Sequence, residues 1–195
     1  MVEIIMNNIF SNINLFTHNI LQAVIKSGDH VLDATAGNGH DTLFLAKSVG
    51  SQGIVYSFDI QETAIFNTSA LLSEHHLLER VRIIHDGHEN MVKYISKGLK
   101  AVIFNLGYLP KSDHQVKTLP ETTVIALGQA LDILLPGGLI TVTIYSGHES
   151  GESEKKAVEE YLKNLDKTKW DVLIWSFLNR IPTAPFLIVI HRRGG

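Results

Sequence analysis

Short runs of β-branched residues alternate with amphipathic segments along almost the whole chain. In residues 11–26, apolar side chains recur at the three- and four-residue spacing of one helical face, and Gly28 is placed to end that helix. Strand and helix patterns then alternate five times. They predict strands over 30–35, 54–59, 81–86, 101–107 and 139–146, and helices over about 38–48, 61–76, 88–97, 120–135 and 152–166.

The pattern changes at the C-terminal end, where two strand-like runs cover 170–178 and 186–192. The segment NRIPTAP between them is too short for a crossover helix, so these strands are predicted to be antiparallel. The whole pattern predicts an α/β fold, a Rossmann-like doubly wound sheet of seven strands, mostly parallel with an antiparallel final pair. We expect one domain over 1–195, with residues 1–28 as an N-terminal helical extension.

Composition narrows the function classes. The chain has 195 residues, 45% of them hydrophobic and 19% charged, which is typical of a globular protein. The chain contains no cysteine, which excludes disulfides and thiolate chemistry, and a net charge of −3 argues against a broad nucleic-acid coating. The N-terminus lacks the features of a secretory signal, and no apolar run reaches membrane-spanning length. We therefore expect a cytoplasmic protein without a membrane partner.

The segment DATAGNGHDT, residues 33–42, follows the first strand and opens the first helix of the repeats. Gly37 and Gly39 allow a ligand to approach the backbone closely, and the helix N-terminus offers unpaired N–H groups. A G-x-G pair alone also fits a plain tight turn. Thr42 stands where the dinucleotide fingerprint has its third glycine, and Asp33 places negative charge where a pyrophosphate would lie.

These departures favour a ligand with an ammonium group, such as S-adenosylmethionine, over NAD. Asp59 at the end of the second strand is placed to bind ribose hydroxyls, as in both classes of site. Asp86 after the third strand is a candidate for an adenine amino group or for a helix N-cap, with Gly87 leaving room for the ring. His85 and His88 flank it, but no third ligand at metal-binding spacing accompanies them, and no metal is expected.

Two later strand ends carry candidate chemistry. Asn105 and Tyr108 lie in NLGYLP, and Tyr145 and His148 lie in YSGHESGESE. Ligands of such folds bind outside the carboxyl ends of the strands, so these side chains should face the transferred group. The alternatives are a β-turn at NLGYLP and a helix-capping histidine at His148.

The motifs DATAGNGHDT, NLGYLP with the downstream TLPETT, PGGLI and YSGHESGESE, together with the order of elements, resemble those of class I S-adenosylmethionine-dependent methyltransferases. More narrowly, they resemble a small bacterial family long labelled rRNA methylases. That family includes the tRNA methyltransferase acting on the aminomethyl group of 5-aminomethyl-2-thiouridine at the wobble position. The resemblance covers the chain from about residue 15 to residue 192.

The resemblance implies specific roles for matching positions. It implies S-adenosyl-L-methionine as the cofactor and a cofactor site at Asp33, Ala34, Gly37, Asn38, Gly39, Asp41, Asp59, Gln61, Asp86, Gly87, His88, Asn105 and Leu106. It implies a substrate-facing motif at Gly107, Tyr108 and Leu109, and a late motif at Tyr145, Gly147 and His148. Catalytic roles fall on Asn105, Tyr108, Tyr145 and His148, with His148 as the proton acceptor.

For an RNA partner, Lys111 and Arg180 lie in loops expected at the same rim, where backbone phosphates would be contacted. The continuation KSDH and the loop NRIPTAP depart from the family pattern. The resemblance implies the anticodon region of tRNA as the substrate, and these departures keep rRNA and a small amine open as alternatives. An NAD-dependent oxidoreductase and a cofactor-sensing module also stay open, and the apolar N-terminal helix is a candidate lid or homodimer interface.

Overall fold

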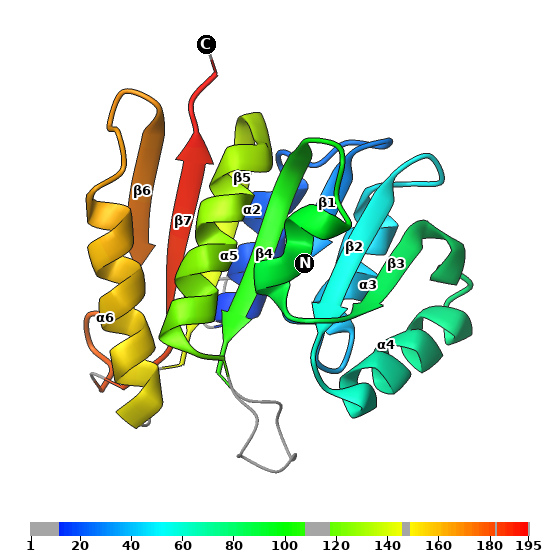
Figure 1. Ribbon diagram of the computed structural model, residues 1–195, viewed down its shortest axis with the longest axis horizontal. Coiled ribbons are helices and arrows are strands. Elements are labelled where there is room, and N and C mark those ends of the chain that lie inside the picture. The colour runs from blue at the N-terminus through cyan, green and yellow to red at the C-terminus, as the bar shows by residue number, and fades with distance from the viewer. Residues whose placement is uncertain (1–11, 108–117, 146–148, 182, 195) are drawn as a thin grey trace, which may run out of the picture.

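The computed structural model describes residues 12–107, 118–145, 149–181 and 183–194. Its centre is one seven-stranded sheet in the order β3-β2-β1-β4-β5-β7-β6 (Figure 1). The first five strands run parallel, and β7 lies antiparallel between β5 and β6, so the predicted fold class is confirmed. The strands are β1 (His30–Asp33), β2 (Ile54–Asp59), β3 (Val81–His85), β4 (Leu99–Leu106), β5 (Leu134–Ile144), β6 (Trp170–Trp175) and β7 (Phe186–Arg192).

Helices cover both faces of this sheet. In Figure 1, α5 and α6 cross in front of the sheet, and α2 and α3 lie behind it. The helices are α2 (Ile13–Gln22), α3 (His40–Ser48), α4 (Glu62–Glu74), α5 (Pro120–Ile133) and α6 (Glu149–Lys163), with 3₁₀ turns η1 (Leu78–Arg80) and η2 (His88–Lys93). None of the helices in the described ranges has the length and apolar character needed to span a membrane.

Each face has its own hydrophobic core, which explains the continuous apolar runs of the central strands. On one face Phe58 and Phe104 pack with Leu127 of α5 and Val158 of α6. On the other face the core is formed by α2, α3 and α4, through Leu21, Leu45 and Leu72 against the sheet. Because β1 to β5 run parallel, their carboxyl ends meet at one edge of the sheet.

Two local predictions were wrong. The segment expected as a helix over 88–97 is the 3₁₀ turn η2, which ends at Lys93. The run Pro136-Gly137-Gly138 was expected to separate helix from strand, but β5 already begins at Leu134 and includes it. The register against β4 shifts between Leu99 and Ala101, beside this run, because proline lacks an N–H and Gly137 takes a φ of +69°.

A buried carboxyl group links three of these elements. Asp33, the last residue of β1, is 0% exposed. Thr42 Oγ1, in the first turn of α3, donates a hydrogen bond to Asp33 Oδ2 at 2.6 Å, and the Thr35 backbone N–H donates to Oδ1 at 3.1 Å. Thr42 Oγ1 also lies 2.8 Å from Ser57 Oγ on β2. Burial, and then the negative charge of Asp41, raises the pKa of Asp33 to about 7.

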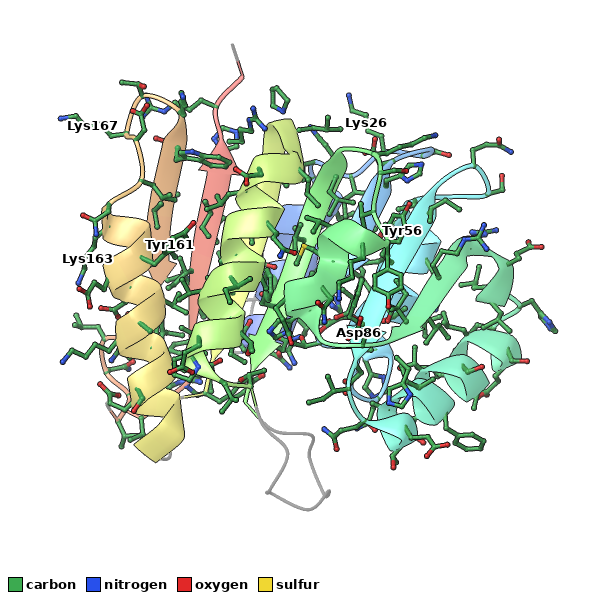
Figure 2. All side chains as sticks on the ribbon, viewed as in Figure 1. Lys26, Tyr56, Asp86, Tyr161, Lys163 and Lys167 are labelled. Carbon is green, nitrogen blue, oxygen red and sulfur yellow. The ribbon has the colours of Figure 1, made fainter. Side chains whose placement is uncertain are left out.

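The carboxyl ends of the parallel strands meet at the edge to which the β4 arrow points in Figure 1. Asp86, just after β3, lies near this edge, whereas Lys26 lies at the opposite end of the sheet (Figure 2). In open α/β sheets this edge is where ligands bind.

The buried carboxyl group predicts an unusual pH dependence of stability. Because the folded-state pKa of Asp33 is raised to about 7 from 3.8, its contribution to stability is complete below pH 3.8 and is lost as the pH rises through about 7. Asp33→Asn removes this loss. We expect the free energy of unfolding of the variant, relative to wild type, to increase between pH 5 and pH 8.5 by up to about 3 kcal/mol, measured by urea unfolding.

The matched control is Asp132→Asn, an exposed carboxylate on α5. Its effect on the free energy of unfolding should be the same at every pH in this range. A pH-independent difference for Asp33→Asn would show that Asp33 is ionised throughout.

Candidate active site

A cavity of about 720 Å³ opens at the carboxyl edge of the sheet. Its walls come from the loop after β1, the ends of β2 to β5, helix α2 and the start of α5. It therefore lies where the sequence places its motifs.

The glycine loop forms one wall of the cavity. Gly37 and Gly39 have φ values of +54° and +81°, in the left-handed region that favours glycine. A Cβ atom on Gly39 would lie 2.8 Å from the Thr68 Cα of α4, so only glycine lets α3 and α4 pack this closely. The Gly37 backbone N–H donates to Asp59 Oδ2 at 2.9 Å, which ties the loop to the end of β2.

The ends of β2 and β3 carry the next two carboxylates. Asp59 Oδ1 accepts a hydrogen bond from the Gln61 backbone N–H at 2.9 Å, and both residues line the cavity. Asp86 accepts hydrogen bonds from Tyr94 Oη, from the Gly87 backbone N–H and from Asn90 Nδ2. The hydrogen bond from Tyr94 is the main reason that the pKa of Asp86 is lowered. Gly87, rather than Asp86, is the N-cap residue of η2.

His88 lies deeper in the same wall and is 8% exposed. Its Nδ1 lies 3.2 Å from the Ala34 carbonyl oxygen, and its ring meets the Phe104 ring edge to face. Burial lowers the pKa of His88, so the neutral ring donates its Nδ1 proton to that carbonyl. The buried Nε2 atom has no hydrogen-bond partner among the described residues. Within these residues no three histidine, aspartate or glutamate side chains gather as a metal site would require.

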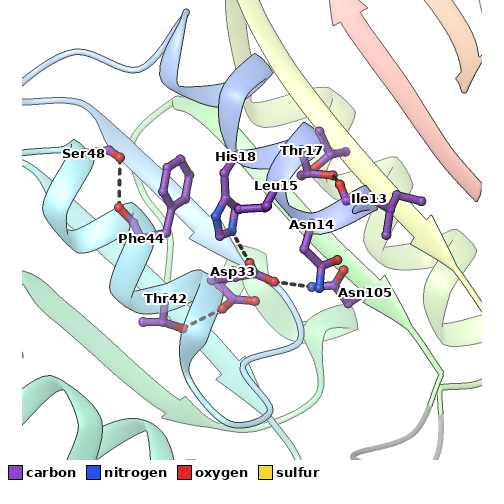
Figure 3. A network of polar contacts seen from close by, with 12 residues as sticks. Ile13, Asn14, Leu15, Thr17, His18, Asp33, Thr42, Phe44, Ser48 and Asn105 are labelled. Atoms are coloured by element: carbon purple, nitrogen blue, oxygen red, sulfur yellow. Dashed lines mark hydrogen bonds and ion pairs between the residues drawn. The ribbon is translucent and has the colours of Figure 1, made fainter. Parts of the chain in front are cut away.

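A chain of polar contacts joins α2, α3 and β4 at the cavity (Figure 3). His18 Nε2, on α2, lies 2.5 Å from Asp41 Oδ1. Asp41 Oδ2 accepts a hydrogen bond from Asn105 Nδ2 at 2.5 Å. Tyr145 Oη, after β5, lies 3.5 Å from Asn14 Oδ1, also on α2. Burial is the main reason that the pKa of Tyr145 is raised, which keeps the phenol protonated.

Sequence reasoning missed Asn14 and His18. Both line the cavity, and they are separated by one helical turn of α2. Their spacing of four residues places two polar side chains on the same face of the helix, which is the signal that was available. It also missed the start of α5, where Thr118 and Thr122 line the cavity and Glu154 of α6 accepts a hydrogen bond from Thr118 Oγ1 at 2.7 Å.

The structure brings most of the predicted site residues together around the cavity. Those that line it are Ala34, Gly37, Asn38, Asp41, Asp59, Gln61, Asp86, Gly87, His88, Asn105, Gly107 and Tyr145. Three others, Asp33, Gly39 and Leu106, lie close by without lining it, and the side chains of Asp33 and Leu106 are buried. Arg180 is exposed and lies over the Phe177 ring at 3.3 Å, away from the lining. Tyr108, Leu109, Lys111, Gly147 and His148 lie outside the described residues.

The charges around the cavity all have one sign. Asp41, Asp59, Asp86 and Glu89 line it, whereas none of the described lining residues is lysine or arginine. Four carboxylates with no lysine or arginine beside them in the described lining disfavour a ligand that carries phosphates and favour one that carries positive charge.

Comparisons with known proteins agree with this geometry. A model of the family described as "Putative rRNA methylase" matches residues 55–191. The chain is 40% identical to the "tRNA (mnm(5)s(2)U34)-methyltransferase, chloroplastic" of Arabidopsis thaliana, over 90% of this chain and 68% of that protein.

Two solved structures are also similar. A "putative rRNA-methylase" from Clostridium thermocellum has a TM-score of 0.89 and 48% identity, covering 90% of this chain and 95% of that one. A "putative methyltransferase" from Streptococcus mutans, in complex with SAH, has a TM-score of 0.83 and 38% identity, covering 91% and 96%. The chain therefore belongs to the family described as "Putative rRNA methylase" and is a methyltransferase with a Rossmann-like fold.

Proposed function

We propose that the protein transfers a methyl group from S-adenosylmethionine to the amine of 5-aminomethyl-2-thiouridine at the wobble position of tRNA. The observation that carries the proposal is the cavity lined by Asp41, Asp59, Asp86 and Glu89, with no lysine or arginine among its described lining residues. Both the methyl donor and a protonated amine acceptor are cations, so this charge suits both of them. The 40% identity to a tRNA (mnm(5)s(2)U34)-methyltransferase supports the choice of acceptor.

The methyl donor is S-adenosylmethionine, and the residues present fit its parts. Asp59 would hold the ribose hydroxyls, since its carboxylate lies at the end of β2 and faces the cavity. Gly87 and His88 would flank the adenine, with Asp86 beside them. The neighbouring Streptococcus mutans structure holds SAH, the demethylated form of this donor.

The methionine end of the donor would lie toward the glycine loop. Asp41 lines the cavity there and is the carboxylate placed to face its ammonium group. Asp33 does not line the cavity and has a raised pKa, so its part in binding is to hold the loop through Thr42 and Thr35.

When bound, S-adenosylmethionine supplies a methyl group made electrophilic by the sulfonium. The protein's own task is to hold the acceptor nitrogen in line with that group, a contribution that can be worth roughly 7–11 kcal/mol. Asn105 and Tyr145 both line the cavity, at the ends of the neighbouring strands β4 and β5, so both are placed to orient an amine. We also propose catalytic roles for Tyr108 and His148. An alkylammonium must lose a proton before it can react, and His148 would accept that proton.

Binding should depend on the carboxylate at the end of β2. We expect Asp59→Asn to weaken S-adenosylmethionine binding on the order of 10-fold or more in calorimetry, because hydrogen bonds to a charged group are lost. Asp132→Asn, far from the cavity on α5, should bind like wild type. Tighter binding of NAD than of S-adenosylmethionine by the wild-type protein would contradict the cofactor assignment.

The reaction itself is tested on tRNA that carries 5-aminomethyl-2-thiouridine, incubated with the protein and S-adenosylmethionine. Mass spectrometry of the nucleosides should show this nucleoside heavier by one methyl group, and tRNA without the aminomethyl group should stay unchanged. A methyl group found on an rRNA nucleoside or on a free amine, with none on tRNA, would replace the proposed substrate.

Turnover should also depend on the two proposed catalytic side chains outside the described residues. Since general acid–base catalysis contributes typically 10²–10⁴-fold, we expect His148→Ala to lower kcat by roughly 100-fold with saturating cofactor, and Tyr108→Phe to lower it less. His75→Ala, an exposed residue at the end of α4, is the control. Wild-type turnover in both His148→Ala and Tyr108→Phe would show that the base assignment is wrong.

A further inference from the structure

The amide of Asn105 is held in one orientation by the carboxylate beside it. Asp41 Oδ2 lies 2.5 Å from Asn105 Nδ2, and the Asn105 backbone N–H donates to Thr35 Oγ1 at 2.8 Å. An ionised carboxylate only accepts hydrogen bonds, so the NH₂ end of the amide must face Asp41. The other end of the amide, the carbonyl oxygen Oδ1, is thereby left to accept a hydrogen bond from a ligand in the cavity.

The same carboxylate is held from its other side by the N-terminal helix. His18 Nε2 lies 2.5 Å from Asp41 Oδ1, so the ring donates its Nε2 proton to that oxygen. The His18 ring also stacks on Phe44 of α3, with centroids 3.9 Å apart and planes 3° apart. Ring stacking and hydrogen bond together fix the direction from which His18 reaches Asp41 (Figure 3).

We propose that His18 is a positioning residue for methyl transfer, which acts through Asp41 to keep the Asn105 carbonyl oxygen directed at the acceptor amine. The inference rests on the proposed amine methylation and adds to it a role for α2, which becomes a wall of the active site. Without the His18 donor, the Asp41 carboxylate is free to rotate and the Asn105 amide is free to turn its NH₂ end toward the amine. Such a turn replaces an acceptor of the amine's hydrogen bond with a repelling donor.

Helix α2 has other anchors, so the hydrogen bond can be removed without detaching the helix. Ile13 and Leu21 are buried, and the Phe16 ring stacks on Trp175 of β6 with centroids 4.7 Å apart. Thr17 is buried as well and bonds back to the Ile13 carbonyl oxygen within the helix. A change confined to His18 therefore tests the polar contact rather than the folding of α2.

Two variants separate the hydrogen bond from the ring packing. His18→Phe keeps an aromatic ring on Phe44 and removes the donor, and His18→Gln keeps an N–H donor near the Nε2 position and removes the ring. We expect His18→Phe to lower kcat on the order of 10- to 100-fold, since displacement of a positioned group by about 1 Å has that effect. His18→Gln should recover most of this loss.

Cofactor binding should separate from turnover. His18→Phe leaves the Asp41 side chain and the other residues proposed to hold the donor unchanged, so the Kd for SAH measured by calorimetry should change by less than about threefold while kcat falls. The control is Asn19→Ala on the same helix, an exposed residue whose side chain donates to the Leu15 carbonyl oxygen and has no other hydrogen bond among the described residues. It should match wild type in both measurements.

The side-chain amide signals of Asn105 in ¹⁵N NMR spectra give a readout that needs no turnover. They should shift in His18→Phe and stay in place in Asn19→Ala. Wild-type kcat in His18→Phe, equal losses in His18→Phe and His18→Gln, or unmoved Asn105 signals would each overturn the inference. If wild type itself methylates no amine, the proposed function fails, and the Asn105 signals alone then decide whether His18 positions this amide.

Discussion

The site depends on the burial of one carboxyl group at the end of β1. Asp33 is held by Thr42 Oγ1 and by the Thr35 N–H, which locks the glycine loop and the first turn of α3 against the sheet. Asp41 precedes Thr42 in that turn, so fixing one side chain inward directs its neighbour into the cavity. This burial raises the pKa of the Asp33 carboxyl group to about 7, and the hydrogen bonds that satisfy the group hold the loop in place.

That arrangement also explains the charge of the cavity. With its pKa raised to about 7, Asp33 carries less negative charge behind the loop than an ordinary carboxylate, whereas Asp41, Asp59 and Asp86 face the ligand. Hydrogen bonds from the protein already stabilise these three carboxylates, including those from the Gly37 N–H and Tyr94 Oη. The protein therefore holds a cluster of anions in place before any ligand binds, which favours a cationic donor and disfavours a pyrophosphate.

Most of the fold was predictable because strand and helix periodicities are local properties of the chain. The chemistry of single residues was harder to predict from the sequence. In the sequence, Thr42 stands where a glycine is missing, and Asp33 is interpreted as a ligand contact. The two residues are nine positions apart, and the hydrogen bond between them forms only when α3 packs on β1. His18 meets Asp41 across 23 residues, and no local pattern reports that contact. The antiparallel final strands were predictable since a short loop permits nothing else.

The two halves of the site differ in how the chain builds them. Most residues expected to hold the methyl donor lie within 33–89, in the segments that follow β1, β2 and β3, whereas Asn105 and Leu106 of β4 lie outside that range. The acceptor side takes Asn14 and His18 from α2, Asn105 from β4, Thr118 from the start of α5 and Tyr145 after β5. Those contacts exist only in the folded protein, and α2 is held there partly by Trp175 of β6, near the other end of the chain. The donor side therefore uses mainly segments that are close together in the sequence, whereas the acceptor side uses residues spread from α2 to the end of β5.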